Sequence, residues 1–411
     1  MEQKLPRKHK RRFPSVMEFI ALMAAMMAMV SLPIDITLPA FPTLTRDFSL
    51  AGANTAQTTV TIYTLGFALG QMFYGPLSDA LGRKPLLMVG FAVSCLASLF
   101  IVFNSNFTFL LVGRFFQGVG CAAPRIIAIA VIRDMFGGRR MAKVMSTIIT
   151  VFVLAPMFAP SIGGVLLALG DWRWIFWFLF VVSLAVMLWT NLRLPETKPS
   201  YKRKSFSMAA MAEAFAAMLA IRQTLGYSLA IMFMFGCLLS WITSAQQIFA
   251  DIYDVHGSFP AFFAMIAGCA AVGSFVNNRL VMRLGTRLLS HSALIGIIAM
   301  GALLVLLASA GVVPLVGFCI MIGAILFAYA LAVSNFTPLA MHKVGHISGM
   351  ASSFIGFTQT AGGGVLGYLV GQAYNHTIIP MTLGFVVFGL ASLLSILFAE
   401  KGRFMNTSRG E

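Results

Sequence analysis

Charged residues are scarce in this chain, and acidic residues are the scarcest of them. Charged side chains make up 10% of the 411 residues, whereas the surface of a soluble protein requires about 25%. The chain has 13 acidic and 29 basic residues, and 59% of its residues are hydrophobic, with a mean hydropathy of +0.88. This composition indicates that lipid rather than water surrounds most of the chain. The sequence contains no soluble basic domain that would bind nucleic acid, so we expect no nucleic-acid partner.

Residues that form metal sites, cofactor sites and catalytic pairs are also few. All five cysteines lie within apolar runs without the spacing of metal ligands, and the six histidines are scattered. No Walker motif is present, which argues against a mechanism driven by ATP. The sequence shows neither a pair of nucleophile and base nor a sizeable extramembrane domain. We therefore expect no metal, no cofactor and no enzymatic activity.

Long apolar runs, in contrast, recur along the whole chain. A bilayer core about 30 Å thick is crossed by roughly 20 helical residues. Runs of that length predict an all-α membrane protein with twelve transmembrane helices, at 15–38, 55–77, 86–104, 108–132, 143–168, 173–193, 226–250, 259–281, 288–308, 312–334, 347–370 and 378–398. They predict a basic N-terminal segment, a six-helix bundle, a linker on the membrane surface, a second six-helix bundle and a tail, at 1–14, 15–193, 194–225, 226–398 and 399–411.

Basic residues occur mainly in alternate connections between these runs. If the N-terminus is cytoplasmic, the central linker is cytoplasmic too, together with Arg83, Lys84, Arg139, Arg140, Lys143, Arg283, Arg287, Lys343, Lys401 and Arg403. The opposite connections hold little beyond Arg46 and Arg173, next to several aspartates. The positive-inside rule therefore predicts that both termini are cytoplasmic.

The connection after the second predicted span carries a distinctive motif, Gly75-Pro-Leu-Ser-Asp79-Ala-Leu-Gly82-Arg83-Lys84. A fainter copy follows the eighth span, with Met282 in place of the acid. The first copy resembles the loop signature of the major facilitator superfamily. This resemblance implies two pseudo-symmetric six-helix bundles with a substrate site between them, and a cytoplasmic latch formed by Gly75, Asp79, Gly82, Arg83 and Lys84. Met282 predicts a weaker latch in the second half, and a plain loop with cytoplasmic bases is the alternative for the first.

The fourth predicted span contains Arg114-Phe-Phe-Gln117-Gly118, which resembles the fourth-helix motif of the same superfamily. Inserting an arginine at this depth costs about 2.5–3.5 kcal/mol, so its side chain is expected to face a cavity or an anion. Arg125 lies eleven residues further on, almost on the same helical face as Arg114. Arg125 either serves in the cavity, neutralises packed backbone carbonyl groups, or extends to the cytoplasmic edge of the membrane.

The fifth predicted span contains Ala155-Pro156-Met-Phe-Ala159-Pro160-Ser161-Ile-Gly163-Gly164. The two prolines remove backbone donors and bend the helix, and the glycines let neighbouring backbones approach closely. This run resembles the antiporter motif of drug exporters, and the resemblance implies that Pro156, Pro160, Gly163 and Gly164 seal one side of a cavity. The alternative is a glycine-rich packing face without directional meaning.

Asp35 is the one acidic residue that lies well inside a predicted span. Burial favours the protonated form of a carboxyl group, and a nearby cation favours the ionised form. With Arg114 as its electrostatic partner, Asp35 would load and release a proton near physiological pH, as proton-coupled exchange requires. Alternatively, Asp35 caps the outer end of the first span beside Pro33 and Pro39.

The residues around Asp35, Leu32-Pro33-Ile-Asp35-Ile-Thr-Leu38-Pro39, resemble the first helix of the bacterial Bcr/CflA multidrug group. Shorter phrases agree, namely Arg133-Asp134, Trp172-Arg-Trp174 and Leu194-Pro-Glu-Thr197, so the resemblance covers nearly all of the first half. Some drug exporters carry a second acid about two turns before the aspartate, where this chain has Met26, Met27 and Ala28. Recognition of lipophilic dications is therefore not implied.

The resemblance implies a proton-coupled antiporter of the bacterial inner membrane that exports small amphipathic drugs or related compounds by alternating access. We expect a monomer in the lipid bilayer, whose partners are small-molecule substrates and protons. Superfamily geometry implies a substrate cavity lined by Tyr63, Gln117, Arg125, Trp241, Gln246 and Tyr329. Two alternatives remain, a transporter of a specific metabolite such as a sugar, amino acid or siderophore, and a membrane-embedded enzyme or receptor.

Overall fold

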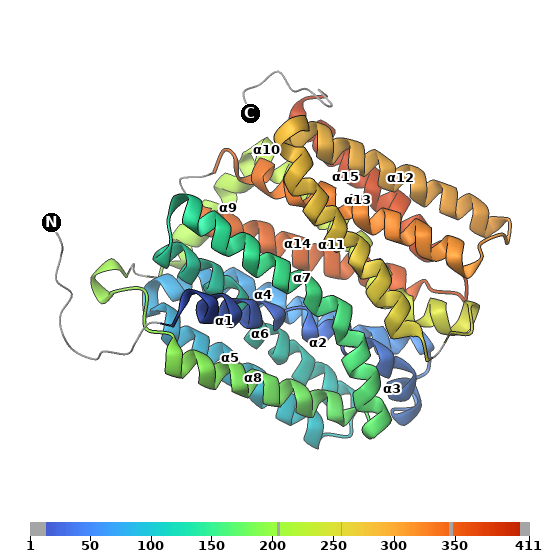
Figure 1. The fold of residues 1–411 in the computed structure, drawn as a ribbon, viewed down its shortest axis with the longest axis horizontal. Helices are drawn as coiled ribbons and strands as arrows, with labels where there is room; N and C mark the ends of the chain where they lie inside the picture. The colour runs from blue at the N-terminus through green and yellow to red at the C-terminus, as the bar shows by residue number, and fades with distance from the viewer. Residues whose placement is uncertain (1–13, 204–205, 256, 345–347, 403–411) are drawn as a thin grey trace.

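The computed structural model of the chain describes residues 14–203, 206–255, 257–344 and 348–402, and these residues form helices and no strand. Long helices run side by side and antiparallel through the molecule (Figure 1). They are α1 (Val16–Ala28), α2 (Leu32–Asp35), α3 (Phe41–Asp47), α4 (Thr58–Leu81), α5 (Arg83–Phe103), α6 (Phe107–Met135), α7 (Gly138–Leu169), α8 (Arg173–Arg193), α9 (Met208–Ala220), α10 (Arg222–Gln247), α11 (Phe259–Leu284), α12 (Thr286–Ser309), α13 (Leu315–Met341), α14 (Ser348–Gln372) and α15 (Ile379–Glu400). The predicted segment 1–14 and the tail 399–411 lie mostly outside the described residues.

The first predicted span is broken rather than continuous, which corrects the expectation of one helix over 15–38. Helix α1 ends at Ala28, and the chain resumes as α2, a short 3-10 turn at Leu38–Ala40, and α3. The two parts are bent by 44° at the break. Pro33, Pro39 and Pro42 each stand in the first turn of one of the short helices. Because proline lacks an N–H group and clashes with the preceding turn, three prolines in ten residues prevent one straight helix.

The other eleven predicted spans each correspond to one long helix. Among the described residues, eight helices are long and apolar enough to cross a membrane, and a ninth span results if the bent pair is counted once. Helices α4, α7 and α14 do not meet that criterion, although they contain 24, 32 and 25 residues. A helix of about 20 residues already spans the hydrocarbon core. Their lengths are therefore sufficient for crossing, and the polarity of α4 and α14 fits helices that face protein rather than lipid.

The helices form two groups, which meet along two pairs of helices. Helices α1 to α8 pack among themselves, as do α10 to α15, and between the groups α4 packs along α14 while α7 packs along α11. Backbone contact within the first group is close: a Cβ atom on Gly66 would lie 2.0 Å from the Phe115 carbonyl oxygen, and one on Gly118 would lie 2.1 Å from that of Tyr63. Only glycine permits this approach of α4 to α6.

The linker between the groups contains an amphipathic helix, as its pattern suggests. Helix α9 buries Met211, Ala214 and Met218, which recur at helical spacing, whereas Met208 and Leu219 are exposed. Phe215 of α9 packs against Phe354 of α14 with ring centroids 5.3 Å apart. The linker helix α9 therefore packs on the second group of helices, and its apolar residues Met208 and Leu219 stay exposed.

Candidate functional site

Asp35 ends the short helix α2 in the broken part of the first span, where 2% of its surface is exposed. No side chain among the described residues forms a hydrogen bond or an ion pair with its carboxyl group. Glu18, at the start of the same span, is in contrast paired with Arg193, whose Nε and terminal nitrogen lie 2.5 and 2.6 Å from the carboxylate oxygens. An ionised carboxylate removed from water is unfavourable without a partner. Asp35 is thus an isolated acid in the interior of the protein.

Arg114 was expected to pair with Asp35, and the structure instead directs it to neutral oxygen atoms. Its guanidinium donates to the Pro33 carbonyl at 2.9 Å, the Thr59 carbonyl at 3.2 Å and Gln117 Oε1 at 2.8 Å. The side chain is fully buried, with its guanidinium carbon 4.7 Å from the centre of the Tyr63 ring. Pro33 lies two residues before Asp35. Arg114 therefore fixes the segment that carries the acid, without an ion pair to the acid in this conformation.

Tyr63 and Gln117 belong to the same buried network. The Tyr63 hydroxyl donates toward the carbonyl groups of Met29 and Val30, at 3.3 and 3.1 Å, where α1 has ended. Gln117 donates through Nε2 to Ser98 Oγ at 2.8 Å while its Oε1 accepts from Arg114. At most 1% of the surface of either residue is exposed. Tyr63 binds carbonyl groups freed by the break in the first span, and Gln117 orients Arg114, which holds the Pro33 carbonyl, so the network positions Asp35.

Arg125 and Tyr329, two residues predicted for the cavity, lie near each other in different groups of helices. Arg125 of α6 and Tyr329 of α13 interact electrostatically but form no hydrogen bond, and both are partly buried. The Arg125 guanidinium carbon lies 5.9 Å from the centre of the Phe67 ring of α4. The two groups of helices therefore bring a cation and two aromatic rings, those of Phe67 and Tyr329, close together.

Trp241 and Gln246, the remaining cavity predictions, lie in α10. Trp241 is 1% exposed and stacks on Phe263 of α11 with ring centroids 5.9 Å apart, and it also contacts Phe249 and Phe318. Gln246 is 8% exposed, and no hydrogen bond joins its side chain to a described residue. The indole is part of the second group's aromatic packing, whereas the amide of Gln246 keeps its hydrogen-bonding capacity.

The proline- and glycine-rich run of α7 contacts the broken first span on one side and α11 of the second group on the other. Helix α7 continues through Pro156 and Pro160 without interruption. A Cβ atom on Gly163 would lie 2.2 Å from the carbonyl oxygen of Ile36, the residue after Asp35, while one on Gly164 would lie 3.7 Å from Pro260 of α11. The motif therefore connects the segment that carries Asp35 to the contact between α7 and α11.

The motif at 75–84 joins helix ends at what we call the basic end of the molecule, where α4, α6, α8 and α15 end. Arg83 binds Asp79 at 2.8 Å, Asp134 of α6 at 3.1 Å and Ser78 at 2.5 Å. Glu196, just after α8, accepts from the backbone N–H groups of Arg83 and Lys84 at 3.0 and 3.1 Å. The sequence-based latch lacked these partners, Asp134 and Glu196, although both occur in the phrases that resemble the Bcr/CflA group.

Glycine is required in this motif because Gly82 adopts φ +105°, and Gly285 in the second copy adopts φ +77°. Asp79 also binds Lys198 of the linker. Gly75 approaches α14, where its Cβ atom would lie 2.8 Å from Ser353 Oγ. The ion pairs thus tie the ends of α4, α5 and α6 to the linker, directly beside the contact between the two groups.

The second copy is stabilised by a different acid. Arg287 Nε lies 3.2 Å from Glu400 Oε1 at the end of α15, and Tyr227 of α10 donates to the same oxygen at 2.9 Å. His291 lies 3.3 Å from the Tyr227 hydroxyl. Glu400 is the last residue of α15, whereas Glu196 follows the end of α8 by three residues. The second copy has Met282 where the first has an acid, and Glu400 of α15 instead provides the carboxylate that pairs with Arg287.

Replacing Arg83 with glutamine is expected to lower transport activity at least about tenfold, because Asp79 and Asp134 would lose the buried cation that they share. Lys84→Gln is the control, since Lys84 is partly exposed and its Nζ binds the Asn191 carbonyl. Initial transport rates at matched protein amounts provide the measurement. Equal losses in the two variants would contradict a specific role of Arg83.

A polar cluster joins the two groups at the opposite end of the molecule. Asn54 donates to the carbonyl groups of Gln372 and Tyr374 at 3.2 and 3.0 Å and accepts from Gln247 at 2.9 Å. Gln57 donates to Gln247, and a Cβ atom on Gly371 would lie 2.0 Å from Gln57 Oε1. Sequence analysis missed this contact, because neutral amides in connections carry no motif. The cluster closes the space between the groups at this end.

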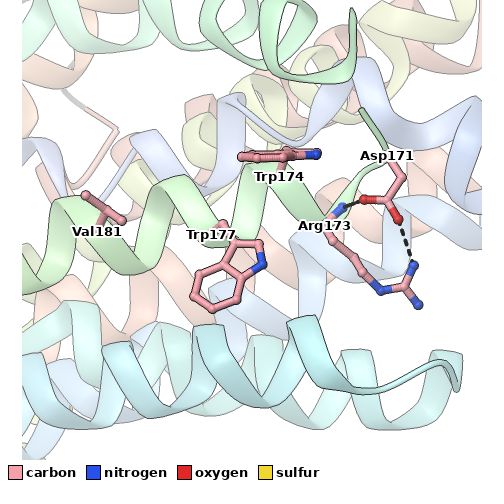
Figure 2. Close-up of a pocket in the computed structure, with 5 residues that line it drawn as sticks. All are labelled: Asp171, Arg173, Trp174, Trp177 and Val181. Atoms are coloured by element: carbon pink, nitrogen blue, oxygen red, sulfur yellow. Dashed lines mark hydrogen bonds and ion pairs between the residues drawn. The ribbon is translucent and has the colours of Figure 1, made fainter. Parts of the chain in front are cut away.

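A shallow pocket of about 450 Å³ lies outside that space, along one face of α8 (Figure 2). Asp171 and Arg173 pair at 2.9 Å at one end of it, and Trp174 and Trp177 lie along the helix. Trp174 is half exposed. Tryptophans at a helix end beside charged residues are typical of the interface between membrane and water. This pocket therefore marks a membrane boundary and belongs to no path between the groups.

Comparison with known proteins agrees with this geometry. Residues 19–368 match the model of the Major Facilitator Superfamily. The chain is 32% identical over 386 residues to a bicyclomycin resistance protein homolog of Haemophilus influenzae, covering 92% of this chain and 94% of that protein. It is 25% identical to the multidrug resistance protein MdtL of Escherichia coli, covering 94% and 96%. Among solved structures, a D-xylose–proton symporter shares the fold with a TM-score of 0.69 at 13% identity, covering 95% of this chain and 100% of the other.

These findings confirm the resemblance to the superfamily and to Bcr/CflA-like drug exporters, and the fold of two pseudo-symmetric six-helix bundles. Members of this family are membrane transporters of small molecules, so a transport function replaces the enzyme alternative. The isolated acid, the network around Arg114 and the motif at 75–84 are thereby placed in a multi-pass transport protein. The chain belongs to the major facilitator superfamily.

Proposed function

We propose that the protein is a proton-coupled antiporter that exports small amphipathic drugs or related compounds by alternating access. The observation that carries this proposal is Asp35, a buried acid with no partner among the described residues. Acidic residues inside a membrane are costly, and they mark proton and ion pathways. The similar proteins named for bicyclomycin resistance and multidrug resistance support export of drugs.

The proposed cycle uses Asp35 as the proton carrier. In its closed surroundings the carboxyl group is neutral, because an unpaired carboxylate there is unfavourable. Opening toward water, or arrival of a substrate, allows the proton to leave. Arg114 acts as a positioning residue, because it holds the Pro33 carbonyl and has no ion pair with the acid. Substrate and proton then occupy the protein in alternation, which couples their opposite movements.

Alternating access requires each end of the space between the bundles to open in turn. We assign the polar cluster of Asn54, Gln57 and Gln247 to the outer closure, and the motif at 75–84 to the inner latch. Clustered bases at the inner end support an orientation with both termini in the cytoplasm of a bacterial cell and the protein in its inner membrane. The antiporter motif of α7 connects the acid to the contact that must open.

Asp35→Asn tests the proposal. Purified wild-type protein in detergent is expected to release protons when amphipathic antibiotics are added, and Asp35→Asn is expected to release none. Substrate affinity of the wild type should weaken by up to about tenfold per pH unit on acidification, because one proton competes with the substrate. The variant should show no such dependence.

Glu213→Gln is a matched control, because Glu213 is an exposed acid of α9 outside the proposed pathway. It should release protons as the wild type does. Equal release from wild type and Asp35→Asn would assign the coupling to another group and contradict the proposed role of Asp35.

A further inference from the structure

The second intramembrane arginine, Arg125, differs from Arg114 in having no partner. Arg114 donates to three oxygen atoms and is fully buried. No hydrogen bond or ion pair joins Arg125 to any residue in the described part of the chain. Its guanidinium carbon lies 5.9 Å from the centre of the Phe67 ring. A cation inside a membrane protein normally pairs with an acid or with backbone carbonyl groups, so the guanidinium of Arg125 retains its full capacity to donate.

The only acid well inside the predicted spans lies too far away to neutralise Arg125. Asp35 stands near Pro33, at the level of Arg114, whose guanidinium contacts the Pro33 carbonyl. Arg125 follows Arg114 by eleven residues, or about 16 Å along the helix axis. Both side chains point from nearly the same face of α6. Arg125 therefore lies deeper toward the basic end, with no acidic partner at its level among the described residues.

The surroundings of Arg125 suit a ligand rather than a structural ion pair. Tyr329 of the second bundle is near enough to interact electrostatically with Arg125 but forms no hydrogen bond with it, and Phe67 of the first bundle lies beside the guanidinium. The Tyr329 hydroxyl has no partner in the described residues either. A forked guanidinium and a nearby phenol from the other bundle can bind one anionic group together, because both donate to oxygen and the guanidinium does so bidentately. The aromatic faces beside them would hold an apolar body.

We propose that Arg125, with Tyr329, binds an anionic group of the substrate, so that the preferred substrates are amphipathic organic anions such as aryl carboxylates. This inference rests on the proposed function, because that function makes the space between the bundles the transport path. It narrows the substrate class from amphipathic compounds in general to those with one acidic group. The absence of a second acid near Met26 and Met27 agrees with it, since the first bundle offers little to attract a dication.

Binding of matched acids and esters tests the proposal. Three radiolabelled aryl carboxylates, 2-naphthoate, 4-phenylbenzoate and 6-methoxy-2-naphthoate, are compared with their methyl esters on the full-length protein in detergent at fixed pH. The wild type is expected to bind at least one acid about tenfold or more tightly than its ester, as a hydrogen-bonded charge pair would give. Arg125→Gln should lose this preference, and Arg125→Lys should keep part of it.

Arg133→Gln provides the control, because Arg133 lies on the same helix but at its exposed basic end. This variant should keep the preference of the wild type. A wild type that shows no preference for any acid, or an Arg125→Gln protein that retains the preference, would overturn the assignment.

The experiment separates this inference from the proposed coupling. Binding in micelles needs no proton gradient, so a preference for acids that depends on Arg125 would stand even if Asp35→Asn released protons normally. Conversely, normal proton release by uncharged compounds together with equal binding of acids and esters would leave antiport intact and remove Arg125 from substrate recognition.

Discussion

Arg114→Gln is expected to destabilise the protein strongly, and Arg125→Gln, on the same helix, is expected to leave its stability nearly unchanged. The Arg114 guanidinium donates to Pro33, Thr59 and Gln117. Each hydrogen bond from a charged donor contributes about 1.5–3 kcal/mol, and a buried acceptor left without its donor adds a further cost. We expect a loss on the order of 4 kcal/mol and a fall in apparent melting temperature on the order of 10 °C.

The difference is measured by thermal unfolding of the purified variants, with size-exclusion chromatography used to monitor the fraction of protein that stays folded. Arg125→Gln removes the same charge from the same helix, but it breaks no hydrogen bond to a described residue. Its melting temperature should equal that of the wild type or exceed it, because an unpaired cation is removed from the protein interior. Equal shifts in the two variants would mean that the loss of intramembrane charge, and not the network around the first span, controls stability.

This contrast also defines what could be read from the sequence. The two arginines lie eleven residues apart on one apolar helix, and their spacing places them on one face. Nothing in the sequence shows that one binds the Pro33 carbonyl and the other binds no described residue. Carbonyl acceptors become available only where a helix is broken, and the extent of the break depends on how α4 and α6 pack against it. The predicted electrostatic pairing of Asp35 with Arg114 therefore stays a prediction, since in this structure Arg114 donates to the carbonyl of Pro33, two residues before the acid.

The helices themselves were predictable, because a lipid environment requires apolar runs of a fixed length. The position of the motif at 75–84 was predictable as well, because its residues are close together in the sequence. Their partners Asp134 and Glu196 come from segments 51 and 113 residues away. Such distant pairs form only when the helix ends pack together, and the spacing of residues within one motif does not predict that packing. The pairing of Arg287 with Glu400 was not predicted for the same reason, because the two residues lie 113 positions apart.

Gly163→Ala is expected to lower transport at least about tenfold, whereas Gly164→Ala should leave transport unchanged or slightly improve stability. The new Cβ atom at position 163 would lie 2.2 Å from the Ile36 carbonyl oxygen, a backbone atom that cannot rotate away. Overpacking of this kind costs about 1–3 kcal/mol or more, and each 1.4 kcal/mol is about tenfold in a rate. The displaced atom belongs to the residue after Asp35, so the strain falls on the proposed proton carrier.

The adjacent glycine makes this prediction specific. At position 164 a Cβ atom would lie 3.7 Å from Pro260, an ordinary contact, and alanine is about 0.5–1 kcal/mol better than glycine in a helix interior. Initial rates of drug-stimulated proton exchange in proteoliposomes, with both variants at the same protein density, measure the two effects. If both alanines reduce the rate alike, the glycines act as flexible points of α7. A loss confined to Gly163→Ala would instead show that close contact between α7 and the broken first span holds Asp35 where coupling requires it.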